Sequence, residues 1–272
     1  MKRGISAAGS APHWQCGGQG FKSPILHQTK HVFLTCFFHK IILKGEKVVG
    51  NNKSIIHFGV RVQKRNRSYK LNRDEFATIN THPSLPRFSS LEKRNAYSDA
   101  SCNEYRFEWC EEYREFCLTS YDKNINYFSK LDSNEFNYAI SQFLISYPNF
   151  KEVVDLNDYN ETEGYYMMVL DEYKQVYIGK SVNIKKRIQQ HWSCTKPFDR
   201  TLFPLYNTNS VLSIDFFRAL DTTRIYAWKT HMTFGFERDL VYDFPEKFSC
   251  NRIGGDVDDP IDGMLTARKH DL

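Results

Sequence analysis

The segment from residue 164 to residue 193 constrains the fold more than any other part of the chain. It contains two short, largely apolar runs, Met167–Leu170 and Gln175–Ile178, separated by four residues that suit a loop. Runs of this length joined by about four residues are typical of a β-hairpin. Side chains alternate between the two faces of a strand, so Tyr166 and Met168 are predicted to share one face.

The sequence period changes after the second run. Ile184, Ile188 and Trp192 recur at intervals of four residues, which indicates the apolar face of an α-helix. Ser181 precedes this pattern, and serine is a favoured helix N-cap because its hydroxyl accepts from a backbone N–H of the first turn. The sequence therefore predicts a hairpin that leads directly into a helix.

This arrangement brings four polar side chains toward one another. Arg187 and His191 are four residues apart, so they lie on one helical face, one turn from each other. The preceding hairpin can direct Tyr166 and Tyr177 toward the same place. A tyrosine on a strand is usually packing, and a basic helix face is usually solvated. The joint spacing, rather than any one residue, predicts a shallow functional pocket.

The same spacings resemble the GIY-YIG nuclease superfamily, which is named for two strand tripeptides. The first is Gly164–Tyr166, with Tyr165 in place of isoleucine, and the second is Tyr177–Gly179 unaltered. Lys180, directly after the second tripeptide, resembles the repair-type members. The resemblance covers about residues 160–256. It implies an α+β fold with a small antiparallel β-sheet flanked by helices, preceded here by a mostly helical N-terminal domain.

The superfamily also has a glutamate on a later helix and an asparagine beyond it. Phe236 and Leu240 begin an apolar helical pattern that Pro245 ends, and Glu237 lies beside its apolar face. Asn251 follows Glu237 by 14 residues, which is close to the usual gap of the superfamily.

The resemblance implies a metal-dependent endonuclease that hydrolyses DNA phosphodiester bonds, with one Mg²⁺ or Mn²⁺ held by Glu237. Tyr166 is expected to be the general base or to orient the water with Tyr177, after Lys180 and Arg187 lower its pKa. Arg187 would also hold the scissile phosphate. His191 would hydrogen-bond a tyrosine or the phosphate. The full predicted site comprises the catalytic residues Tyr166, Tyr177, Arg187, His191 and Glu237 and the substrate-binding residues Gly179, Lys180 and Asn251.

The charge distribution is compatible with a nucleic-acid partner. The formal net charge is +5, which is weak evidence by itself. Residues 40–73 carry ten lysines or arginines and one acid, Glu46. Arg200, Arg218 and Arg224 fit either phosphate contacts or surface pairs with neighbouring aspartates. A non-catalytic or repair-associated nucleic-acid-binding module remains the alternative to a nuclease.

The seven cysteines predict neither a disulfide framework nor a zinc site, because they lack the short paired spacing of either. Trp109, Cys110, Tyr113 and Cys117 instead recur at helical spacing, which predicts an amphipathic helix with buried thiols. The longest apolar run, residues 32–43, is too short to span a bilayer. The protein is therefore expected to be cytoplasmic.

The predicted organisation has four parts. Residues 1–47 are predicted to be a disordered or mis-annotated extension, residues 48–160 an N-terminal domain whose expected role is target recognition, residues 161–256 the nuclease-like domain, and residues 257–272 a flexible tail. Within these parts the sequence predicts a strand in residues 54–62, a loop at 80–90, helices at 104–121 and 134–145, and a third sheet strand beginning at Val211 and running toward Leu220.

The first residues also suggest a genetic context. Gly20–Pro24 can be encoded by a nucleotide sequence that resembles the T-arm of a transfer RNA, and Ile25–Gln28 by an acceptor end that closes in CCA. Lys44–Glu46 can be encoded by a ribosome-binding sequence. These coincidences favour a later start of the natural chain and an enzyme carried by a mobile genetic element.

Overall fold

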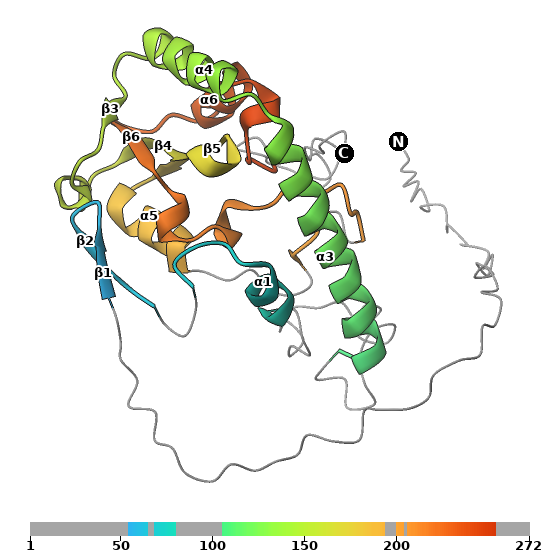
Figure 1. Ribbon diagram of the computed structural model, residues 1–272. Helices are drawn as coiled ribbons and strands as arrows, with labels where there is room; N and C mark the ends of the chain where they lie inside the picture. Colours follow the sequence, from blue (N-terminus) through green and yellow to red (C-terminus); the bar gives the residue numbers. More distant parts are fainter. Residues whose placement is uncertain (1–53, 65–67, 80–104, 194–199, 204–205, 254–272) are drawn as a thin grey trace, which may run out of the picture. The chain divides into compact units, whose positions relative to one another are not determined.

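A computed structural model describes residues 54–64, 68–79, 105–193, 200–203 and 206–253 (Figure 1). The predicted extension 1–47, loop 80–90 and tail 257–272 lie outside the described residues. All the described residues belong to one compact unit, Gly50–Leu272. The fold is mixed α+β, with small antiparallel sheets and helices, in agreement with the predicted class.

A four-stranded antiparallel sheet forms the centre of the fold. Its strands, in spatial order, are β3 (Lys151–Glu152), β6 (Arg224–Lys229), β4 (Gly164–Leu170) and β5 (Gln175–Ser181). The predicted hairpin is confirmed: β4 and β5 are joined by a single 3-10 turn, η2 (Asp171–Tyr173), and by Lys174. The register pairs Tyr166 with Gly179 and Met168 with Tyr177.

The prediction of a third strand from Val211 toward Leu220 is wrong, because the strand beside β4 is β6. The predicted segment contains two short 3-10 helices instead, η4 (Ile214–Phe216) and η5 (Ala219–Asp221). Side chains cap these turns: Ser213 Oγ accepts from the N–H of Asp215 at 3.4 Å, and the Asp221 carboxylate accepts from the N–H of Arg218 at 2.7 Å. Such local bonds compete with a strand ladder.

Helix α5 (Ile184–Ser193) follows β5 and buries its predicted apolar face. Its N-cap is not Ser181, which is the last residue of β5. Asn183 Oδ1 accepts from the N–H of Lys186 at 2.9 Å, while Ser181 Oγ accepts from the N–H of Asn183 at 3.0 Å. Serine and asparagine are equally good caps. Strand β5 continues through Lys180 and Ser181, so the helix begins later and Asn183 caps it.

The two faces of the sheet are covered by different helices. Tyr166 and Met168 point into one apolar cluster with α3 (Phe107–Lys130) and α5, whereas Tyr165 and Met167 point into a second cluster with α4 (Ser133–Ser146) and α6 (Phe236–Asp243). Figure 1 shows α4 and α6 on one side of the sheet and α5 on the other. The predicted alternation along β4 is therefore confirmed, with both faces buried.

The helices predicted at 104–121 and 134–145 are present as α3 and α4, and the thiols of Cys110 and Cys117 are buried as expected. The predicted strand at 54–62 is a hairpin of β1 (Ser54–His57) and β2 (Val60–Gln63). Its turn residues Phe58 and Gly59 both have positive φ, which suits a two-residue hairpin turn.

The described residues before 160 share a core with those after it. Val60 of β2, Phe76 of α1 (Arg73–Ile79) and Tyr113 of α3 belong to the same apolar cluster as Tyr166. The remaining short helices are η1 (Leu156–Tyr159) and η6 (Glu246–Phe248). Within the described part of the chain, no helix is both long enough and apolar enough to cross a membrane.

Candidate active site

A chain of hydrogen bonds links strand β4, helix α5 and the turn η4. The Tyr166 hydroxyl lies 2.8 Å from His191 Nε2, and His191 Nδ1 lies 2.8 Å from Asp215 Oδ1. An ionised carboxylate only accepts, so Nδ1 carries the proton and donates to Asp215. In neutral imidazole Nε2 is then the acceptor, and Tyr166 donates to it. Of the two partners that the sequence leaves open for His191, the structure shows the tyrosine.

Arg187 lies at the other end of this chain, where its guanidinium is close enough to the Tyr166 hydroxyl to act on the pKa of that phenol. The two hydrogen bonds share one direction, toward the negative charge of Asp215: Tyr166 donates to His191, and His191 donates to Asp215. Hydrogen bonds aligned in one direction polarise and strengthen one another. The chain ends next to the guanidinium of Arg187, whose residue is exposed at the surface of α5.

The expectation that neighbouring cations lower the pKa of Tyr166 is wrong. Burial raises that pKa well above its ordinary value, the nearby Tyr177 adds to the increase, and Arg187 only partly opposes it. Tyr166 has no exposed surface, so it is a neutral phenol without direct access to water.

Tyr177 is the more accessible of the two phenols, because it is only partly buried. Its pKa is also raised, first by burial and then by the charge of Glu237, with Arg187 acting in the opposite direction. Its ring meets the His191 ring edge to face, with 4.9 Å between centroids. Tyr177 therefore contacts the hydrogen-bond chain at His191, is close enough to Glu237 to be affected by its charge, and stays protonated at neutral pH.

Lys180 and Glu237 lie together, with Lys180 Nζ 3.9 Å from Glu237 Oε2. The two side chains are 27% and 13% exposed. Lys180 is near the end of β5, and Glu237 is in the first turn of α6, as the sequence predicts. The structure thus brings Tyr177, Lys180, Arg187 and Glu237 to one place, which we call the outer layer of the candidate site.

Gly179 makes room for the phenols. A Cβ at this position would lie 2.6 Å from the Tyr166 hydroxyl and 2.9 Å from Cε1 of Tyr177. The sequence predicts that Gly179 keeps the backbone close to a phosphate, but the contact that requires glycine in the structure is with the buried Tyr166.

Asn251 is bound to the protein backbone. Its Oδ1 accepts from the N–H of Ile178 at 2.9 Å, and its Nδ2 donates to the carbonyl of Ile178 at 2.7 Å. Its side chain is buried, and Ser249 Oγ also donates to Oδ1. The amide therefore anchors β5 beside Tyr177, and this geometry assigns Asn251 to positioning the site rather than to contact with a substrate.

Asp215 was not among the predicted site residues. The sequence leaves it as a surface partner of Arg218, but Arg218 Nη1 donates to the backbone carbonyl of Asp215, and the carboxylate faces His191. The guanidinium of Arg224 pairs with Asp171 instead. The available signal was that Asp215 is the one acid in an otherwise largely apolar segment, where a carboxylate needs a partner.

A divalent cation at the outer layer would have one protein ligand, the Glu237 carboxylate, and would keep most of its own water. Among the described residues, Glu237 belongs to no group of three or more metal-ligating side chains. Mg²⁺ is commonly held by one or two carboxylates, with water and phosphate oxygens as the other ligands. The partly exposed carboxylate of Glu237 suits that role.

No protein-family model matches the chain, and neither the curated proteins nor the solved structures include a match to it.

Proposed function

We propose that this protein is a metal-dependent endonuclease of the GIY-YIG type, which hydrolyses phosphodiester bonds of DNA. The observation that carries the proposal is the outer layer itself. Two cations, one carboxylate and one partly buried phenol meet there: Tyr177 and Lys180 come from strand β5, Arg187 from helix α5 and Glu237 from helix α6. Phosphoryl transfer needs this combination of charge neutralisation and positioning.

Arg187 is assigned to the phosphate, because a guanidinium presents two parallel N–H groups that match two phosphate oxygens. Its geometry is set from behind by Tyr166, His191 and Asp215, so the guanidinium does not have to be ordered when the substrate binds. Tyr166 is therefore a positioning residue in this mechanism, in place of the general base expected from the sequence.

Lys180 supplies a second positive charge next to Glu237. Tyr177 is the less buried of the two phenols, and its neutral hydroxyl can orient a water molecule by donating or accepting a hydrogen bond. Glu237 would hold Mg²⁺ or Mn²⁺, and such an ion, when bound, neutralises charge that develops on the phosphate and lowers the pKa of coordinated water. A phenolate base is not needed under this assignment.

The test is incubation of the purified full chain with supercoiled plasmid, with Mg²⁺ in one sample and a chelator in the other. We expect nicked or linear plasmid only in the sample with Mg²⁺, and loss of both products in Arg187→Ala. Binding of plasmid without cleavage at any Mg²⁺ or Mn²⁺ concentration would refute the nuclease proposal and favour a protein that only binds nucleic acid.

A further inference from the structure

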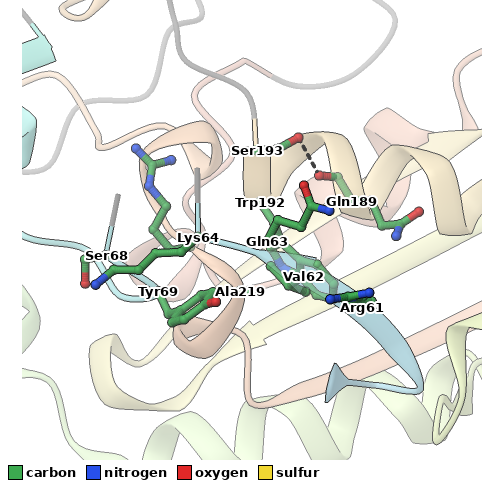
Figure 2. Close-up of a pocket in the computed structure, with 11 residues that line it drawn as sticks. Arg61, Val62, Gln63, Lys64, Ser68, Tyr69, Gln189, Trp192, Ser193 and Ala219 are labelled. Atoms are coloured by element: carbon green, nitrogen blue, oxygen red, sulfur yellow. Dashed lines mark hydrogen bonds between the residues drawn. The ribbon is translucent and has the colours of Figure 1, made fainter. Parts of the chain in front are cut away.

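A second feature faces solvent on the side of α5 away from the candidate site. It is a groove of about 630 Å³ between β2 and the end of α5 (Figure 2). One wall is formed by Arg61, Gln63 and Lys64, and the opposite wall by Gln189, Trp192 and Ser193. The volume is within the range of about 300–1,000 Å³ that is usual for ligand sites.

The groove is positively charged. Arg61, Lys64 and Arg218 line it, and none of the described residues that line it is acidic. Arg218 is buried and donates to the carbonyl of Asp215, so the two exposed cations are Arg61 and Lys64. Arg61 Nε donates to Ser54 Oγ at 2.8 Å, which uses one of the five N–H groups of a guanidinium.

Neutral polar groups complete the lining. Gln63 and Gln189 each carry a side-chain amide that can donate and accept. The Ser193 hydroxyl donates to the backbone carbonyl of Gln189 at 2.9 Å, as the dashed line in Figure 2 shows. Cations together with neutral donors and no carboxylate favour an anionic, hydrogen-bonding ligand. A sugar-phosphate backbone has this chemistry.

The position of the groove on α5 relates it to Arg187. Helical residues turn by about 100° each, so Gln189 and Ser193 lie roughly 200° and 240° around the helix from Arg187. The outer arc of the helix between these two residues and Arg187 holds Lys186 and Gln190, which form a polar ridge. The groove and the guanidinium therefore border the same outer ridge of α5 from opposite sides.

The spacing suits one duplex. A helix with side chains is about 10–12 Å across, and the major groove of B-DNA is about 12 Å wide. Gln189 and Ser193 are displaced from Arg187 by only about 3 and 9 Å along the helix axis. A duplex that lies over the ridge of Lys186 and Gln190 can thus present one phosphate to Arg187 and a second backbone segment to the groove.

We propose that the groove between β2 and α5 binds a backbone segment of the DNA duplex apart from the phosphate that is cut, with Arg61 and Lys64 as its phosphate contacts. This inference rests on the proposed nuclease function. It gives Arg61 and Lys64 a role in holding the substrate and none in the chemical step.

The test measures binding of a labelled DNA duplex of mixed sequence as a function of salt. All proteins carry Glu237→Gln so that the duplex stays intact. Arg61→Gln with Lys64→Gln should make the slope of log affinity against log salt less steep by about 1.8, because each lost phosphate contact removes about 0.9. Between about 50 and 200 mM salt, the affinity of the parent protein for the duplex should then fall about 12-fold more than that of the double variant.

The matched control is Lys130→Gln with Lys151→Gln, which removes the same charge from exposed residues outside the groove and should leave the slope unchanged. If the control pair changed the salt slope by the same amount, the effect of the groove substitutions would be one of net charge alone, and the inference would be overturned. Equal slopes for the groove variant and its parent, with a reduced slope for Arg187→Ala, would refute the groove while the nuclease proposal stands. Absence of duplex binding by the parent would refute both.

Discussion

Substitution of Gly179 by alanine tests the packing that underlies the candidate site. The added methyl would be 2.6 Å from the hydroxyl and 2.8 Å from Cζ of Tyr166, and 2.9 Å from Cε1 of Tyr177. Tyr166 cannot move aside freely, because it is fully buried between two paired strands and its hydroxyl is held by His191. The ring must shift, and the hydrogen bond to His191 must lengthen or break.

The expected loss of stability follows from known costs of overpacking, which are about 1–3 kcal/mol. For a cooperative unit of roughly 150–250 residues, each kcal/mol lowers the melting temperature by about 2–4 °C. Gly179→Ala should therefore melt about 2–12 °C below the wild type in a thermal scan followed by circular dichroism. It should also cut DNA more slowly, since Tyr166 would no longer hold Arg187 in place.

A double-mutant cycle isolates the cause. Tyr166→Phe removes the atom nearest to the new methyl, so Gly179→Ala combined with Tyr166→Phe should cost at least about 0.5 kcal/mol less than the two single losses added together. Wild-type melting of Gly179→Ala, or strictly additive losses, would show that the close approach of Gly179 to Tyr166 is not a constraint in the folded protein.

Three further outcomes are expected. Asp215→Asn should lower both stability, by about 1 kcal/mol, and cleavage, because the bond from His191 loses its charged acceptor; unchanged values would refute the positioning chain. Tyr177→Phe should cut up to about 100-fold more slowly yet unfold at the wild-type temperature, since a partly exposed ring is kept and only a hydroxyl is lost. Burial and then Asp243 raise the pKa of Tyr147 to about 12. The stabilisation that the protonated Tyr147 hydroxyl contributes to the folded state is therefore complete below about pH 10, the pKa of an unfolded tyrosine, and is lost as the pH rises to about 12. The difference in unfolding free energy between wild type and Tyr147→Phe should accordingly shrink over that interval, and a constant difference would contradict the assignment.

The parts of the fold that the sequence predicts are those with a strong local period. Helices α5 and α6 repeat apolar residues at helical spacing, and the hairpin of β4 and β5 consists of two apolar runs separated by a polar turn. Strand β6 was missed because Tyr226 and Trp228, which alternate with the buried Ile225 and Ala227, are also apolar, so the sequence shows no apolar–polar alternation, and alanine is a weak strand former. The more apolar segment after Val211 drew the strand prediction instead.

The residues of the candidate site likewise divide into those that the sequence predicts and those that it does not. Tyr166, Tyr177, Arg187 and His191 are placed by one hairpin and one helix, so their spacing predicts their meeting. The partner of His191 comes from a separate turn, and only tertiary packing brings Asp215 to it. Burial is also non-local: β4 is covered on both faces by helices from before and after it in the chain, which leaves the Tyr166 phenol neutral and enclosed.

The most direct test of the proposed function compares two substitutions on α6. Glu237 faces Lys180 at the outer layer, whereas Asp239, two residues later, is exposed. Glu237→Gln and Asp239→Asn remove the same charge from the same helix, so they differ only in whether the candidate site is altered. Single-turnover cleavage of plasmid DNA with Mg²⁺ should fall by about 100-fold or more in Glu237→Gln and stay at the wild-type rate in Asp239→Asn. Wild-type cleavage by Glu237→Gln, or equal losses in both variants, would contradict the assignment of this site.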